Sequence, residues 1–250
     1  MRVRRIREGC IDIEWCRYTD IRLAADAKAA ARQLCENSDT IERVRIRLTG
    51  RVRNETLAEA TVQCGPHVFR VQLVTGTDSV VPVLAEHVER KLSCTADGVP
   101  FWWSGSIDPR LTCASETKPI VRRKLVRLRR CSPCDAARDL EAGDYTTRLF
   151  IDVDTGEDSV VFRPGIQSAA DPLVLGLRRR RTQWPPLDAA APHRFVVGAP
   201  ARVMTETAAM RELCEKGLAT LFFVDDCWLR GRLLYRRYDQ RLGLVIPTSG

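Results

Sequence analysis

The sequence predicts an α+β protein: an N-terminal β-α-β-β-β-α domain, with two helices on one face of its sheet, followed by two small repeated α+β domains. Three observations predict this class. Strand-like and helix-like apolar patterns alternate over the first 95 residues. Residues 135–163 then align without a gap with residues 208–236, which indicates a duplication. Stretches rich in proline, glycine or arginine separate these parts.

The elements of the N-terminal domain follow from the spacing of its apolar residues. Ile11 to Trp15 alternates as a strand does, and Asp20 offers a cap for the helical pattern that follows. Arg43 to Leu48 alternates arginine with aliphatic residues, which predicts a strand with one dry face. Gly65-Pro66 predicts a hairpin turn. The expected elements are strand 11–15, helix 21–34, strands 43–48, 60–64 and 68–74, and a helix with apolar positions from 81 to 92.

The 250 residues are enough for two or three compact units, and a composition of 44% apolar and 29% charged residues is that of a globular chain. The predicted boundaries are 1–95 for the N-terminal domain, 96–120 for a linker, 121–165 for the first repeat, 166–194 for a basic, proline-rich and mobile linker, and 195–250 for the second repeat. The chain has no apolar run of the ~18 residues that a membrane span needs and no signal-peptide pattern at its start. We therefore expect a cytoplasmic location without membrane contact.

The charge pattern suggests binding of a polyanion. Forty basic residues against 32 acidic ones give a net charge of +8. Arg43, Arg45 and Arg47 recur every ~6.8 Å along one strand face, where Arg70 can join them, and such a row could follow a phosphate backbone. The alternative for each of them is a solvated surface charge. The remaining candidate RNA contacts are Arg22, Lys28 and Arg32 on the first helix and Arg90 and Lys91 at the end of the second.

The two repeats are each too small to bury a secure core alone, so we expect them to pack on each other. Leu149 to Asp152 matches Phe222 to Asp225, and the strand that follows is matched as well. In the second repeat, Trp228-Leu229 replaces the Thr-Gly of the first turn, which leaves its hairpin geometry open. The residues expected to form the contact between the repeats are Phe150, Val161, Phe162, Phe222, Phe223, Leu234 and Tyr235.

No pattern in the chain points to catalysis, a cofactor or a metal site. Cys131-Ser132-Pro133-Cys134 at a helix start has the spacing of a thiol-exchange motif, but it lacks a βαβ context, and packing of small thiols is the favoured interpretation. The ten cysteines are expected to stay reduced. Phe101-Trp102-Trp103 either folds back on the first domain or stacks on bases or a partner. The basic clusters at 122–130 and 178–181 are either additional anchors for the polyanion or solubility features.

Two C-terminal segments resemble a known family. Leu221-Phe-Phe-Val-Asp225 and the closing run from Leu233 to Pro247 are similar to the C-terminal domain of long-form ribosome hibernation-promoting factors. The predicted N-terminal order is also that of the family. Two C-terminal copies after one N-terminal domain look most like the actinobacterial variant.

The resemblance implies an inhibitor without an active site. It implies binding to the small ribosomal subunit, through 16S rRNA and small-subunit proteins, where the N-terminal domain blocks the path of messenger and transfer RNA, silences translation and stabilises ribosomes under stress. Because both C-terminal copies lie in one chain, we expect them to pair within it. The connector has a reach of roughly 30 Å, which gives an effective concentration of about millimolar. The alternative is an RNA-binding regulatory adaptor whose repeats hold a protein partner.

Overall fold

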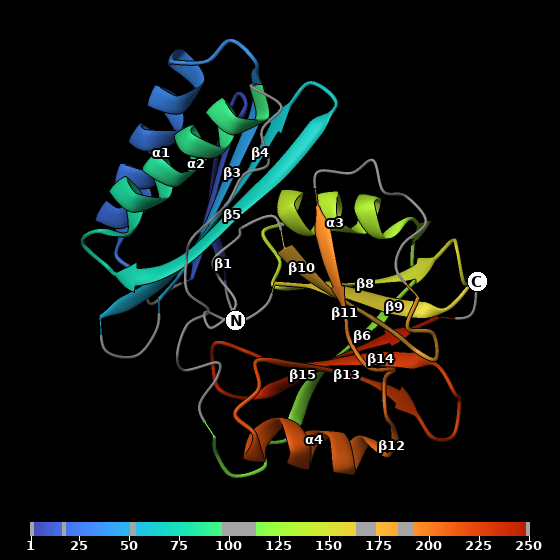
Figure 1. The fold of residues 1–250 in the computed structure, drawn as a ribbon. Coiled ribbons are helices and arrows are strands. Elements are labelled where there is room, and N and C mark those ends of the chain that lie inside the picture. The colour runs from blue at the N-terminus through green and yellow to red at the C-terminus, as the bar shows by residue number, and fades with distance from the viewer. Residues whose placement is uncertain are drawn as a thin grey trace. The chain divides into compact units, whose positions relative to one another are not determined.

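A computed structural model describes residues 3–16, 19–50, 54–96, 114–163, 174–184 and 193–248 (Figure 1). The chain divides into two compact units, one with the elements up to residue 96 and the other with those from residue 120. Both combine helices with antiparallel and parallel strand pairs, so the predicted α+β class is confirmed. Within the described ranges, no helix is both long and apolar enough to cross a membrane.

The first unit is a five-stranded sheet with two helices on one face (Figure 1). Its strands lie in the order β1-β2-β3-β4-β5, and only β2 and β3 run parallel. The elements are β1 (Val3–Glu8), β2 (Ile11–Cys16), α1 (Ile21–Glu36), β3 (Ile41–Gly50), β4 (Glu55–Cys64), β5 (His67–Gly76) and α2 (Val80–Ala96). Strand β1 is absent from the predicted order, because five of its six residues are exposed and only Ile6 packs against the core.

The core of this unit lies between the sheet and the two helices. Asp20 caps α1 by accepting a hydrogen bond from the Arg22 N–H at 2.9 Å. From α1, Leu23, Ala27 and Leu34 are buried at helical spacing against the inward row of β3. Each buried leucine contributes about 1.5–3 kcal/mol, so this face fixes the helix on the sheet. The opposite face of the sheet carries mostly polar side chains.

The second unit contains two further five-stranded sheets, ordered β11-β10-β9-β8-β7 and β12-β13-β14-β15-β6. Their elements are β6 (Ile120–Val126), β7 (Arg130–Cys131), α3 (Pro133–Ala142), β8 (Thr147–Asp152), β9 (Asp158–Phe162), β10 (Val174–Arg179), β11 (Arg194–Val197), β12 (Val203–Met204), α4 (Glu206–Glu215), β13 (Thr220–Asp225), β14 (Gly231–Arg236) and β15 (Leu242–Pro247). We call β7 to β10 with α3 the first copy, and β12 to β15 with α4 the second copy.

Strand β10 corrects the predicted linker at 166–194. Its residues pair with β9 in antiparallel register, and Leu175 and Leu177 are fully buried. The arginines of this segment predict a mobile connector, yet Leu175 and Leu177 lie at alternate positions on one face of the strand. The other domain boundaries stay a prediction.

The strand that precedes each copy completes the sheet of the other copy. Strand β6 comes before the first copy but pairs in parallel with β15 of the second. Strand β11 comes before the second copy but pairs in parallel with β10 of the first. The two copies therefore share backbone hydrogen bonds as well as side-chain contacts.

The two sheets of this unit lie face to face with α3 and α4 on their outer sides (Figure 1). Between the sheets, residues from both copies form one cluster, which includes Leu149, Val160, Phe222, Val224 and Leu233. Phe162 packs against this cluster as well.

Four of the residues predicted to form the contact between the copies instead face the helix of their own copy. Phe150 and Val161 pack under α3, and Phe223 and Leu234 pack under α4. The Tyr235 ring lies near Gly243 and 5.4 Å from the Lys124 Nζ. A strand alternates its faces with a period of two, so the neighbours of these four, Leu149, Val160, Phe222 and Leu233, face the other sheet instead.

The turn of the second hairpin keeps the geometry of the first without its glycine. Gly156 has a φ of 68° and donates to the Asp152 carbonyl at 2.7 Å. Its counterpart Leu229 has a φ of 52° and donates to the Asp225 carbonyl at 2.9 Å. The left-handed conformation is costly for a residue with a Cβ, so this turn stores strain.

Leu229→Gly is expected to stabilise the protein by about 0.5–1 kcal/mol, because glycine adopts this φ without penalty. The leucine side chain is 50% exposed, so little packing is lost. The measurement is the urea midpoint of the full chain. Trp228→Gly is the matched control, since Trp228 is the neighbouring residue of the same turn and is exposed to solvent, but its φ is not positive. A gain for the control as large as for Leu229→Gly would contradict the strain argument.

Candidate nucleic-acid interface

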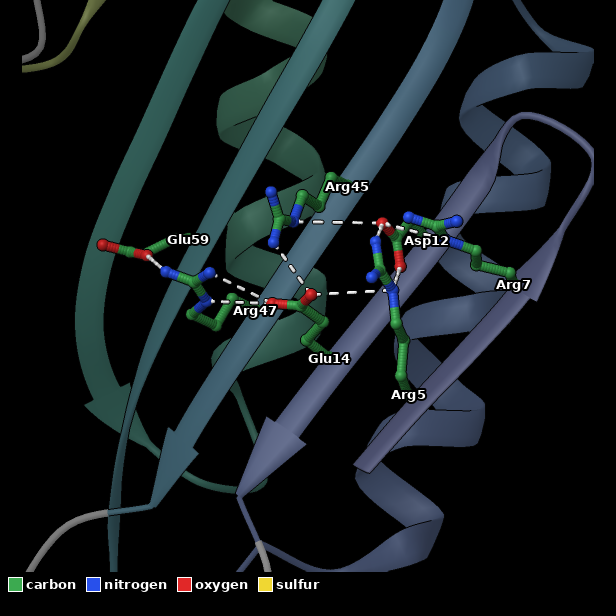
Figure 2. Close-up of polar contacts among 7 residues, drawn as sticks. All are labelled: Arg5, Arg7, Asp12, Glu14, Arg45, Arg47 and Glu59. Carbon is green, nitrogen blue, oxygen red and sulfur yellow. Dashed lines mark hydrogen bonds and ion pairs between the residues drawn. The ribbon is translucent and has the colours of Figure 1, made fainter. Parts of the chain in front are cut away.

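The outer face of the first sheet carries the arginines that the sequence singles out. In β3, Val44, Ile46 and Leu48 face the helices, so Arg45 and Arg47 face away from them. Figure 2 shows that both guanidinium groups point toward Glu14 of the neighbouring strand β2. The arginines are therefore not an isolated row of positive charge.

Carboxylates and arginines alternate across the strands of this face. The register places Glu14 between Arg5 and Arg47, and Asp12 between Arg7 and Arg45. Arg45 Nη2 donates to Glu14 Oε1 at 2.8 Å, and Arg47 Nη2 donates to Glu14 Oε2 at 3.0 Å. We call the set drawn in Figure 2 the arginine–carboxylate ladder; its members are Arg5, Arg7, Asp12, Glu14, Arg45, Arg47 and Glu59.

The ladder is strongly ionised because its two central acids are nearly enclosed by guanidinium groups. A hydrogen bond from Arg5, followed by the charges of Arg5, Arg7 and Arg45, lowers the pKa of Asp12 despite its burial. Burial acts to raise the pKa of Glu14, but the hydrogen bonds from Arg47 and Arg45 and the charges of these two arginines together outweigh it, and the pKa is lowered. Both acids are therefore charged at neutral pH, and they offset part of the positive charge of this face.

Among the other predicted RNA contacts of the sheet and helices, Arg22 and Arg43 are exposed to solvent. Arg70 donates to Glu59 Oε1 at 2.7 Å, which extends the ladder to β5. Lys91 differs from the predicted exposed cation. Its Nζ donates to the Arg70 carbonyl at 2.8 Å and lies 5.6 Å from the centre of the Phe69 ring.

The remaining basic residues of the two helices are engaged in local ion pairs. Lys28 and Arg32, one turn apart on α1, both pair with Glu8 of β1. Arg90 pairs with Glu86 one turn earlier on α2. Exposed pairs of this kind contribute only about 0–1 kcal/mol, so these side chains can exchange a carboxylate for a phosphate at small cost.

The basic clusters of the second unit contain both buried or paired arginines and solvent-exposed ones. Arg179 is completely buried and pairs with Asp152, which is buried too. Arg123 makes a two-pronged pair with Glu206 on α4, and Arg129 pairs with Asp139 on α3. Arg122, Arg127 and Arg130 are exposed. The cluster at 178–181 is thus partly a structural element, whereas that at 122–130 keeps exposed positive charge.

The competing thiol interpretation is not favoured by the surroundings of the two cysteines. Cys131 and Cys134 are both buried, and burial raises the pKa of Cys131 to about 11. A reactive thiol needs the opposite shift. One group of possible metal ligands occurs in the described residues, Asp225, Asp226 and Cys227, but Asp225 is already taken by Arg232 and the Trp228 N–H. Phe101-Trp102-Trp103 lies outside the described residues.

Sequence reasoning missed Arg5, Arg7, Asp12, Glu14 and Glu59. For β2 the sequence does carry a signal that Asp12 and Glu14 lie on the outer face, because they alternate with the apolar Ile11, Ile13 and Trp15. The signal for β1 is weaker, since only Ile6 breaks a run of exposed residues.

The arrangement defines a class of protein: a sheet domain whose outer face carries paired arginines and carboxylates, joined to a duplicated α+β unit, with no catalytic grouping in the described residues. Comparison with known proteins makes this specific. Residues 115–165 match the family model described as the sigma 54 modulation/S30EA ribosomal protein C terminus. Over 232 residues the chain is 36% identical to proteins named dormancy associated translation inhibitor in two strains of Mycobacterium tuberculosis, CDC 1551 and H37Rv.

The match covers 89% of this chain and 82% of each relative. The chain belongs to the long ribosome hibernation factor family that includes these dormancy-associated translation inhibitors. The family that the closing sequence motifs resemble is thereby confirmed.

Proposed function

We propose that this chain is a ribosome hibernation factor that binds the small ribosomal subunit in the cytoplasm and stops translation. The observation that carries the proposal is the 36% identity to a translation inhibitor over nearly the whole chain. The proposed contact is between the first unit and 16S rRNA, at the path of messenger and transfer RNA. Inhibition by occlusion needs no catalytic group, which fits a site made of arginines and carboxylates.

The chemistry of the first unit supports phosphate contact at its exposed cations. Arg22 and Arg43 are open to solvent, Arg32 and Arg90 are held by exposed ion pairs, and the half-buried Lys28 pairs with Glu8. Their contribution is electrostatic, so binding should weaken with salt by ~0.7–0.9 in the log-log slope for each phosphate neutralised. Base-specific recognition is not required for a protein that fills a channel by shape.

We further propose that the two C-terminal copies pair within one chain, as their exchanged strands and common apolar cluster support. A copy whose sheet face is already covered has no free face to offer to another ribosome. Stabilisation of single ribosomes under stress, rather than their pairing, is the corresponding role.

The test is inhibition of a cell-free translation reaction, together with sedimentation of the protein with ribosomes at moderate salt. The full chain is expected to co-sediment and to stop synthesis. Arg22→Glu/Arg43→Glu is expected to raise the half-inhibitory concentration at least tenfold, because two cations become anions on the proposed contact. The control Arg211→Glu changes an exposed arginine of α4 in the second unit and should have little effect. No inhibition by the unaltered chain would contradict the proposal, whereas RNA binding without ribosome binding would favour the adaptor alternative.

A further inference from the structure

The second unit has a local two-fold axis that can be located from its hydrogen bonds. Thr147 and Thr220 are counterparts in the two copies, 73 residues apart, and their hydroxyl oxygens lie 3.1 Å from each other. Asp158 and Gly231 are counterparts too, and Asp158 Oδ2 accepts a hydrogen bond from the Gly231 N–H at 2.7 Å. Counterparts that touch must lie next to the axis that relates the copies. The axis therefore passes beside both of these pairs.

The unit departs from two-fold symmetry at the second pair. Asp158 is 4% exposed and accepts hydrogen bonds from Arg230 Nε at 2.7 Å and Arg230 Nη2 at 3.0 Å, besides that from Gly231. Both donors belong to the second copy. The counterpart of Arg230 in the first copy is Glu157, which instead accepts hydrogen bonds from the Arg181 N–H and from Thr182. The acid of one copy is thus matched to an arginine and a backbone N–H of the other.

Glycine is required opposite the aspartate for steric reasons. A Cβ at position 231 would lie 2.7 Å from the Cβ of Asp158 and 2.6 Å from the nearest ring carbon of Phe222. Both distances are shorter than real Cβ contacts allow. There is space for only one side chain beside the axis at this pair, and it is that of Asp158 from the first copy.

Pairing between like copies of two chains would lose this match. Two first copies would bring Asp158 against Asp158 in a buried position without Arg230, and like charges at a buried site disfavour each other strongly. Two second copies would bring Gly231 against Gly231, leaving a void and two Arg230 side chains without their carboxylate.

We propose that Asp158, Arg230 and Gly231 restrict each C-terminal copy to the other copy as its partner and exclude pairing with the same copy of a second chain. This inference rests on the pairing within one chain proposed above and assigns the residues that enforce it. It identifies the partner of each copy by charge and shape: an acid in the first copy requires a glycine flanked by an arginine in the second.

The test places cysteines at the other axial pair of the full chain and follows their oxidation by peptide mass mapping, which distinguishes the new link from the native cysteines. Thr147→Cys/Thr220→Cys is expected to form a 147–220 link within a chain. Thr147→Cys alone is expected to give no 147–147 link between chains. Formation of 147–147 dimers as fast as the 147–220 link would overturn the proposal, and absence of the 147–220 link would overturn the intrachain pairing on which it rests.

The role of the axial acid is tested in the double-cysteine chain. Arg230→Glu, which places an acid against Asp158, is expected to slow the 147–220 link at least tenfold relative to Arg230→Gln, which has the same size but no charge. Asp158→Asn/Arg230→Glu again leaves one acid at the axis, so it should recover the rate of Arg230→Gln. Equal rates for Arg230→Glu and Arg230→Gln, or failure of this recovery, would overturn the assignment. Translation inhibition by the same proteins is scored separately, so failure of the proposed ribosomal activity is distinguishable from failure of the axial assignment.

Discussion

Replacing Arg179 with methionine is expected to destabilise the second unit by about 3–5 kcal/mol, the largest stability effect we expect of a single substitution in this chain. Arg179 is fully buried, and its Nε donates to Asp152 Oδ2 at 2.5 Å. Its Nη1 also donates to the Trp184 carbonyl. Methionine fills much of the space but leaves the Asp152 charge buried without its partner. Urea denaturation of the full chain, followed by circular dichroism, measures the loss.

Two controls separate charge from packing. Arg178→Met changes the neighbouring arginine, which is only half-buried, and should cost less than about 1 kcal/mol. Asp152→Leu/Arg179→Met removes both charges, and should recover most of the stability because no unpaired ion is left in the core. A loss for Arg179→Met no greater than that for Arg178→Met would show that the buried pair contributes little.

The same arginine explains why sequence reasoning missed β10. A run of four arginines at 178–181 is typical of a solvated linker. The sequence around the run does not show that Arg179 pairs with buried Asp152, 27 residues earlier. A second reason why β10 is not recognised lies in the lengths of the loops. The loop before β15 is shorter than the loop before β10, so the ungapped alignment of the two copies stops at Arg163 and Arg236 and does not reach these strands. Gly176 faces the Phe162 ring just as Gly243 faces the Tyr235 ring, which identifies the two strands as counterparts.

The face of a strand cannot be assigned from sequence when consecutive residues are all apolar. In Leu221-Phe222-Phe223-Val224, the odd-numbered and the even-numbered residues are all apolar, because both faces of the strand are buried. One face lies under α4 and the other against the opposite sheet. Strand β3 posed no such problem, since arginine alternates with aliphatic residues and one face is solvated. Repeats that are covered on both sides lose the alternation by which orientation is recognised.

The candidate site was predictable strand by strand but not across strands. Arg45 and Arg47 are on the outer face as their alternation requires. Their neutralisation depends on β2 lying beside β3 in parallel, and this long-range pairing sets which acid meets which arginine. The alternation within β3 therefore predicts where Arg45 and Arg47 lie, but not that the acids of β2 offset their positive charge.

Neutralising the two central acids of the ladder is expected to increase affinity for RNA. In Asp12→Asn/Glu14→Gln, the guanidinium groups of Arg5 and Arg45 lose the carboxylates that they pair with and become available to phosphates, whereas Arg47 loses Glu14 and keeps Glu59. Two additional phosphate contacts would steepen the log-log salt dependence by ~1.4 and raise affinity for a single-stranded RNA about tenfold at low salt. Fluorescence anisotropy with a labelled oligonucleotide over a series of salt concentrations measures both quantities.

The control for this prediction is Glu36→Gln/Asp39→Asn, which removes the same net charge from exposed positions at the end of α1 and beyond it. If the control steepened the salt dependence as much as the ladder variant, the gain would come from net charge alone. A steeper slope confined to the ladder variant means that Asp12 and Glu14 compete with phosphates for the same guanidinium groups. In that case the ladder limits non-specific RNA binding by the free protein, and a ribosomal site must supply enough phosphates in the right places to displace these acids.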